Sequence, residues 1–249
     1  LIYLSKVIGE HEGKQFYLFL KILVLTAIPC FLIFLEPDTG VVLMYILMMF
    51  GLLWASGMSK KYPLILIGSA LIFIAFFFCL YFLNGDIFTR VFGLSFFYRI
   101  DRLISFKNVS SYQLNNALIG VGSSGLFGFG LTHPKIYIPE ATTDFVFDLT
   151  ICNFGLIMGL FIAIIYGILL KNIYRVLNKT TNRMDRTILA GILFMMSFQV
   201  SEHIFMNLGI TPITGITLPF LSYGGSSLIS YFLLFGLILK ITTNSSSYN

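Results

Sequence analysis

Three carboxylates lie four residues apart in the segment IPEATTDFVFD, at Glu140, Asp144 and Asp148. They stand at the mouth of a long apolar run, where an ionised group is costly unless it is paired, hydrated or functional. A carboxylate within hydrogen-bond reach of a hydroxyl group can act as a general base. Two carboxylates on one helix face can instead resist joint ionisation or share a cation. The segment is therefore the first candidate for a catalytic site.

Each of these acids also has a purely structural interpretation. Thr143 or Asp144, placed just before an apolar helix, is what an N-terminal helix cap predicts. Pro139 favours a turn or an extended entry, after which Glu140 would be a solvated acid. Asp148 would be a water-facing or bundle-facing acid without a catalytic role. The spacing alone leaves these alternatives open.

The elements that must position these acids are membrane helices. Of the 249 residues, 57% are hydrophobic and 11% are charged, whereas about a quarter of a soluble domain is charged. Apolar segments near the length of a bilayer, without the alternation of barrel strands, predict an all-α, polytopic helical membrane protein with about six spans. The expected spans are Phe16–Leu35, Val41–Ser56, Leu64–Leu83, Phe145–Leu170, Ile188–Phe205 and Ser226–Ile241.

The basic residues predict the orientation of these spans. The loop at Lys60 and Lys61 and the loop from Lys171 to Arg186 are basic and should face the cytoplasm. The long stretch 84–144 and the segment 208–223 should then lie outside. The formal charge of +5 is mostly this topology signal, so we expect no nucleic-acid partner. Three cysteines without CxxC spacing favour free thiols and no zinc site.

The outside stretch carries two further candidates for anion binding. Arg99, Arg102 and Lys107 are suited either to gripping a pyrophosphate or to anchoring an interfacial helix against lipid phosphates. The glycines of ALIGVGSSGLFGFGL, among them Gly125, permit tight turns and close packing, or line an anionic head group with main chain. No strand precedes the GxGxxG match and no GK[ST] loop is present, so a nucleotide site is not expected.

Four segments, in order, resemble the SEDS family (shape, elongation, division and sporulation), the RodA and FtsW type of bacterial cell-wall protein. They are LEPDTG at Leu35–Gly40, YRIDRLISFKNVSSYQLNNALIGVGSSGLFGFGL at Tyr98–Leu131, IPEATTDFVFD at Ile138–Asp148, and PITGITLPFLSYGGSS at Pro212–Ser227. Such proteins usually have ten spans with both ends in the cytoplasm. The resemblance therefore implies a single integral membrane domain over residues 1–249 that lacks its N-terminal spans.

The resemblance implies a peptidoglycan glycosyltransferase at the outer face of the bacterial cytoplasmic membrane. Such enzymes polymerise lipid II, a disaccharide-pentapeptide carried on undecaprenyl pyrophosphate, beside a class B penicillin-binding protein and other elongation or division proteins. The family's essential carboxylate corresponds to Asp144, which is also the candidate ligand for a divalent cation, Mg²⁺ or Mn²⁺, with no cofactor certain. The expected substrate-binding residues are Glu140, Thr143, Asp148, Arg99, Arg102, Lys107, Gly125 and Ser222.

The sequence departs from the family at positions near this site. Cys152 and Asn153 replace two glutamates, and Asp148 replaces a residue that is commonly small and apolar. We hypothesise that Asp148 raises the pKa of Asp144 or helps to hold a metal. Two other functions stay open: a lipid II flippase, and a non-catalytic scaffold for a penicillin-binding protein.

Overall fold

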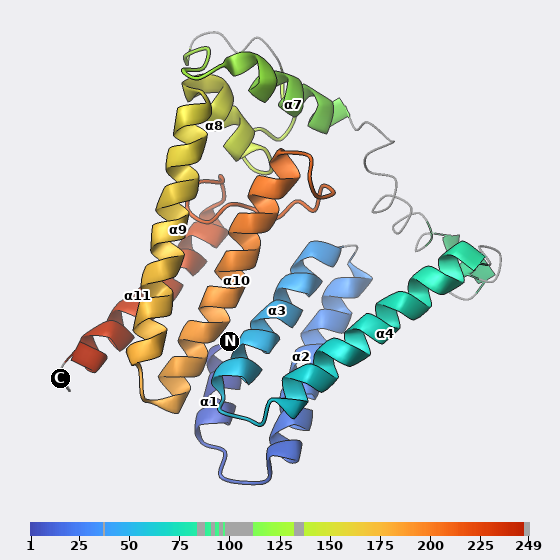
Figure 1. Cartoon of the computed structure of the whole chain (residues 1–249), viewed down its shortest axis with the longest axis vertical. Helices are drawn as coiled ribbons and strands as arrows, with labels where there is room; N and C mark the ends of the chain where they lie inside the picture. The colour runs from blue at the N-terminus through green and yellow to red at the C-terminus, as the bar shows by residue number, and fades with distance from the viewer. Residues whose placement is uncertain are drawn as a thin grey trace.

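The chain is a bundle of helices, in agreement with its composition. The computed structural model describes residues 1–36, 38–83, 88–90, 93–94, 97, 112–131 and 137–246, and this described part contains helices and turns without a strand. The long helices run roughly along one direction in Figure 1. The helices are α1 (Ile2–Gly9), α2 (Gln15–Leu35), α3 (Thr39–Ala55), α4 (Lys61–Leu83), α7 (Tyr112–Ser124), α8 (Val146–Phe154), α9 (Leu156–Lys179), α10 (Arg183–Asn207) and α11 (Gly225–Ser246).

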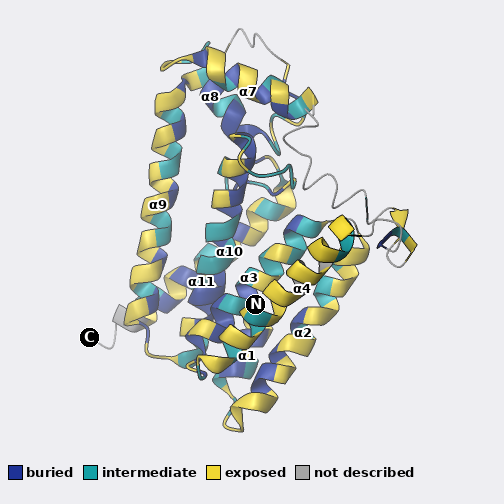
Figure 2. Ribbon diagram, turned by 45° about the vertical axis from the view of Figure 1, so that its right-hand side comes forward, coloured by how far each residue is buried: buried dark blue, intermediate teal, exposed yellow. Residues whose placement is uncertain are grey.

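Helix α10 is the centre of the bundle. Its side chains Leu189, Ile192 and Met196 are fully buried, and Figure 2 shows α10 largely buried beside a largely exposed α9. Helix α3 packs closely against it at Gly51, where an added Cβ would lie 2.9 Å from the carbonyl oxygen of Ala190. The apolar side chains that remain exposed on α9 are those expected to face lipid in a membrane helix.

Four helices of the described part are long and apolar enough to cross a membrane. They are α2, α9, α10 and the segment Gly225–Asn244 of α11, while Thr39–Ala55 and Lys61–Ile72 are shorter apolar helices. The chain is thus a multi-pass membrane protein, and the number of six spans stays a prediction.

The predicted single span Phe145–Leu170 is wrong, because the chain breaks at Gly155 into α8 and α9. Gly155 has φ 85°, a conformation that favours glycine. A Cβ on Gly155 would also lie 2.0 Å from the carbonyl oxygen of Leu126. The close approach of another main-chain segment therefore divides an apolar run that hydropathy alone reads as continuous.

The two ends of the bundle differ in character. At one end Arg183 donates from Nε to the carbonyl of Ser56 at 2.8 Å and from Nη1 to the carbonyl of His11 at 3.2 Å. These contacts bring the α1–α2, α3–α4 and α9–α10 turns together, as predicted for basic loops that share one side. The opposite end carries α7 and α8 (Figure 1).

Candidate active site

Asp144 stands on a tight turn immediately before α8. Glu140 has a positive φ of 52°, and its carbonyl oxygen accepts main-chain N–H bonds from Thr143 at 3.2 Å, Asp144 at 3.1 Å and Phe145 at 3.2 Å. The N-cap residue of α8 is Phe145, with no side-chain cap. The interpretation of Thr143 or Asp144 as the helix cap is therefore wrong, and the Asp144 carboxylate is not engaged in capping.

Three of the predicted site residues come together on this turn. The Thr143 hydroxyl lies 3.2 Å from Oε2 of Glu140 and donates to it, and the Glu140 side chain is exposed. Asp144 is half-buried, and burial, followed by the negative charge of Glu140, raises its pKa above the ordinary carboxylate value. A carboxylate of raised pKa binds a proton more strongly than an exposed carboxylate does, as a general base requires.

Asp148 faces the interior of the bundle, as its structural interpretation allowed. Its side chain is fully buried, and neither carboxyl oxygen has a hydrogen-bond partner among the described residues. Burial raises its pKa to about 8. Burial and the charge of Glu140 account for the raised pKa of Asp144, so the structure does not support the hypothesis that Asp148 raises it. The expected contact of Asp148 with substrate is also not supported, since its carboxylate is not accessible.

Ser222 lies next to the turn through its hydroxyl group. Its Oγ donates to the carbonyl of Thr143 at 2.7 Å and accepts the N–H of Leu218 at 2.8 Å. The residue is 8% exposed. In this structure the side chain therefore holds protein main chain, whereas the family resemblance implies a contact with substrate.

Polar side chains of α9 and α10 hold the segment 208–223 beside Asp144. Glu202 accepts from the Thr214 hydroxyl at 3.2 Å, and Nδ1 of His203 donates to the carbonyl of Ile216 at 2.8 Å. From α9, the Tyr166 hydroxyl donates to the carbonyl of Pro219. Glu202 and His203 are thus buried polar residues whose contacts are made within the protein.

Asn207, at the end of α10, is a site residue that the sequence reasoning did not select. Its buried amide reaches the main chain of Asp144 and of Asp148. The available signal was the spacing of His203 and Asn207, two polar residues one helical turn apart at the end of an apolar run.

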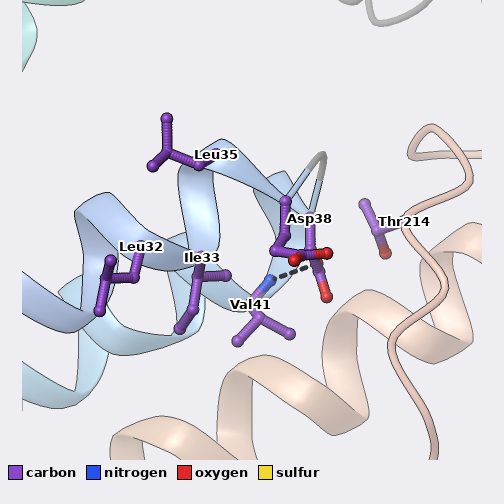
Figure 3. A pocket seen from close by; sticks show the side chains of 7 residues that line it. Leu32, Ile33, Leu35, Asp38, Val41 and Thr214 are labelled. Atoms are coloured by element: carbon purple, nitrogen blue, oxygen red, sulfur yellow. Dashed lines mark hydrogen bonds between the residues drawn. The ribbon is translucent and has the colours of Figure 1, made fainter.

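A cavity of about 860 Å³ opens beside the same segment. Figure 3 shows its lining, with Asp38 facing the loop that carries Thr214. Asp38 accepts the N–H of Val41 at 3.0 Å and is the N-cap of α3. The neighbour of Thr214, Gly215, in turn adjoins the Asp144 carboxylate. The full lining is Leu32, Ile33, Leu35, Glu36, Asp38, Val41 and Thr214.

The glycine-rich segment has a packing role in this structure. Gly120 faces α8, where an added Cβ would lie 2.7 Å from Sγ of Cys152. The Gly125 carbonyl accepts the N–H of Leu156 at 3.1 Å, and Gly130 donates its N–H to the carbonyl of Asn153 at 3.0 Å. Among the hydrogen bonds of the described residues, none joins Gly125 to Asp144. The segment braces the break between α8 and α9.

The remaining predictions concern cations. Arg99, Arg102 and Lys107 lie outside the described residues. Where the structure describes side chains, no group of three or more His, Cys, Asp or Glu residues is placed to hold a metal ion. Glu140 and Asp144 are the two acids of this turn.

Known proteins resemble the chain over nearly its whole length. The sequence profile of the FtsW, RodA and SpoVE family, described as "Cell cycle protein", matches residues 1–247. The probable peptidoglycan glycosyltransferase FtsW of Coxiella burnetii is 34% identical over 262 residues, which cover 97% of this chain and 65% of that protein. Stage V sporulation protein E of Bacillus subtilis is 36% identical over 157 residues, 59% of this chain and 43% of that protein. The chain thus spans less than two thirds of these relatives.

Two solved structures share the fold. One, described as "Structural coordination of polymerization and crosslinking by a peptidoglycan synthase complex", aligns with a TM-score of 0.74 at 22% identity, covering 97% of this chain and 66% of that chain. The other, a mutant of the rod shape determining protein RodA of Thermus thermophilus, aligns with a TM-score of 0.62 at 24% identity, covering 97% and 62%. The profile match over residues 1–247, together with this shared fold, shows that the chain belongs to the FtsW, RodA and SpoVE family of cell cycle proteins, the SEDS family.

Proposed function

We propose that this protein is a peptidoglycan glycosyltransferase that polymerises lipid II at the outer face of the bacterial cytoplasmic membrane, with Asp144 as its general base. One observation carries the proposal. A half-buried carboxylate of raised pKa stands on a braced turn beside a cavity-forming loop, in a family whose relatives include probable peptidoglycan glycosyltransferases.

The chemistry requires one proton acceptor and one leaving group. The Asp144 carboxylate takes the proton of the acceptor sugar hydroxyl, and the hydroxyl oxygen forms a bond with the anomeric carbon of the donor sugar. The bond from that carbon to the pyrophosphate oxygen breaks, and its electron pair leaves with the polyprenyl pyrophosphate. The reaction consumes no nucleotide, in keeping with the lack of a phosphate-loop motif in the sequence.

The cavity is suited to the sugar end of the substrate. Its lining includes the acids Glu36 and Asp38 and no Lys or Arg among the described residues. Such a lining repels an anionic pyrophosphate and accepts hydrogen bonds from sugar hydroxyl groups. The pyrophosphate then requires cations from elsewhere, for which Arg99, Arg102 and Lys107 stay the candidates.

A divalent cation fits the acids of this turn only together with the substrate. Mg²⁺ usually keeps several waters and binds one or two carboxylates plus substrate phosphates. Asp144 and Glu140 are the two carboxylates that would hold it, and the cation would neutralise charge on the leaving pyrophosphate. The described residues alone do not provide a complete ligand set.

The surroundings of the site support the remaining parts of the proposal. The turn with Asp144 lies at the end of the bundle opposite the basic loops, which the positive-inside rule assigns to the cytoplasm. A class B penicillin-binding protein is the proposed partner, and the likeness of fold to a chain from a peptidoglycan synthase complex supports it.

The test is polymerisation of labelled lipid II by the full-length protein in liposomes, with and without a class B penicillin-binding protein. Glycan chains are sized for the wild type, for Asp144→Asn and for the distant control Glu12→Gln. We expect long chains from the wild type and the control, and none from Asp144→Asn. Repetition with EDTA and with added Mg²⁺ or Mn²⁺ measures cation dependence.

Two results would contradict the proposal. Transbilayer movement of lipid II without chain formation would support a flippase. Chain formation that depends on the partner but not on Asp144 would support a scaffold.

A further inference from the structure

Three consecutive main-chain carbonyls, in Thr142–Asp144, each accept a hydrogen bond from a residue distant in the sequence. Tyr223 donates its main-chain N–H to the first at 2.8 Å. Ser222 donates its hydroxyl to the second at 2.7 Å, and Asn207 donates its side-chain amide to the third at 3.0 Å. Two of the three donors are therefore side chains, supplied by the end of α10 and by the segment that precedes α11.

The opposite side of the same turn is held from within. The carbonyl of Glu140 accepts the main-chain N–H groups of residues 143–145. The main chain that carries Asp144 is thus fixed through its N–H groups and its carbonyls. No hydrogen bond among the described residues uses the Asp144 carboxylate, which stays available for chemistry.

The two side chains use all their donor hydrogens on protein main chain. The Asn207 amide is buried and makes three bonds: Nδ2 donates to Asp144 and to the carbonyl of His203 at 2.8 Å, and Oδ1 accepts the N–H of Asp148 at 3.1 Å. The Ser222 hydroxyl both donates and accepts. Every donor hydrogen of the two side chains is therefore taken by a protein carbonyl, so neither side chain can donate to a substrate in this geometry.

From this geometry we infer that Asn207 and Ser222 are positioning residues, which set the place of the Asp144 carboxylate by holding its main chain. The inference rests on the proposed role of Asp144 as the general base. Positioning matters for rate, because a misplacement of about 1 Å can cost about 100-fold. Substrate affinity depends on other contacts and should change little.

The experiment compares variants of matched size in the full-length protein. Ser222→Thr keeps the hydroxyl group. Ser222→Val has the shape of the threonine variant but lacks the hydroxyl group. Asn207→Asp keeps the shape but removes both N–H donors. Initial rates of polymerisation over a range of lipid II concentrations separate kcat from KM. We expect Ser222→Val and Asn207→Asp to lower kcat by about 10- to 100-fold with KM changed by less than about threefold, and Ser222→Thr to stay near the wild type.

Hydrogen exchange measured by mass spectrometry gives a readout that does not depend on activity. Loss of one bond should speed exchange in peptides covering residues 140–149 by about two- to tenfold, while peptides of α9 keep their protection. Global unfolding would instead raise exchange in every helix, so the two cases are distinguishable.

Two outcomes overturn the inference. In one, Ser222→Val matches Ser222→Thr in both kcat and local exchange. In the other, Ser222→Val and Asn207→Asp change only KM. If Asp144→Asn still polymerises lipid II, the proposed role of Asp144 as the general base is wrong, and the exchange measurement still decides whether the two residues hold the turn.

Discussion

The Asp144 carboxylate lies against Gly215, since a Cβ added to Gly215 would stand 3.7 Å from Oδ2 of Asp144. Gly215 has φ 71°, a conformation that favours glycine. The segment that borders the cavity therefore approaches the carboxylate with bare main chain. This leaves room for a substrate group beside the proposed base.

Gly215→Ala should lower the polymerisation rate strongly while reducing the stability of the fold only slightly. The added methyl group would take space beside the carboxylate, and the positive φ should cost about 1 kcal/mol. We expect a fall in polymerisation rate of about tenfold or more. Gly57→Ala is the matched control, because Gly57 has φ 73° and open space around its Cβ position, distant from Asp144 in the α3–α4 turn. Equal activity of the two variants would contradict the prediction.

Glu140→Gln should shift the pH dependence of activity. A general base loses activity as the pH falls through its pKa, and the charge of Glu140 raises the pKa of Asp144. Removing that charge lowers the pKa, so the acidic limb of the rate profile should move to lower pH. The profile of kcat/KM measures this shift, with Glu12→Gln as the control.

Because Glu140 is exposed, high salt should screen its charge and reduce the difference between wild type and Glu140→Gln. If the acidic limb of the pH–rate profile is the same for Glu140→Gln and the wild type at low salt, Glu140 does not act on Asp144.

Asp148→Asn should remove a pH dependence of stability. The native carboxyl keeps its proton up to a pKa of about 8, whereas the unfolded chain releases it near the ordinary value of 3.8. The native state therefore binds more protons between these values, and stability falls as the pH rises through this range. The effect is on the order of 5 kcal/mol across that window.

Thermal unfolding in detergent at several pH values checks this prediction. The Tm of Asp148→Asn minus that of the wild type should increase from pH 5 to pH 8, while Glu12→Gln, at an exposed acid, should show no such trend. Parallel profiles for Asp148→Asn and the wild type would show that Asp148 is solvated or paired.

Tyr166→Phe should loosen the segment beside the site. The buried hydroxyl donates to the carbonyl of Pro219, and its removal leaves that oxygen without this partner, at a cost of about 1–3 kcal/mol. We expect a lower Tm and a lower polymerisation rate. Tyr174→Phe, at an exposed tyrosine on the same helix, is the control and should resemble the wild type.

The helical elements were largely predictable from the sequence. Helices α2 and α4 end at Leu35 and Leu83, as the apolar runs predict. Hydropathy did not predict the break at Gly155, because its cause is the main chain at Leu126, which is distant in the sequence. Short-range patterns report burial in lipid, whereas a close approach between distant segments leaves little local signal.

The candidate site was predictable in its chemistry and not in its supports. The family motif and the acid spacing select Asp144 as the candidate base. Glu140 lies near enough for its charge to act on Asp144, on the turn that Pro139 favours. Nothing local to Ser222 or Asn207 indicates that these side chains hold the carbonyls of Thr143 and Asp144.

By itself the sequence determined the membrane-helical class and, through its motif order, selected Asp144 as the candidate base, because hydrophobicity and motif order are local properties of the chain. Only the tertiary structure decided that Asp148 is buried, that Glu140 lies close enough for its charge to raise the pKa of Asp144, and that three distant donors hold the turn. Burial and hydrogen-bond partners depend on which segments pack together, and that packing joins residues more than 60 positions apart.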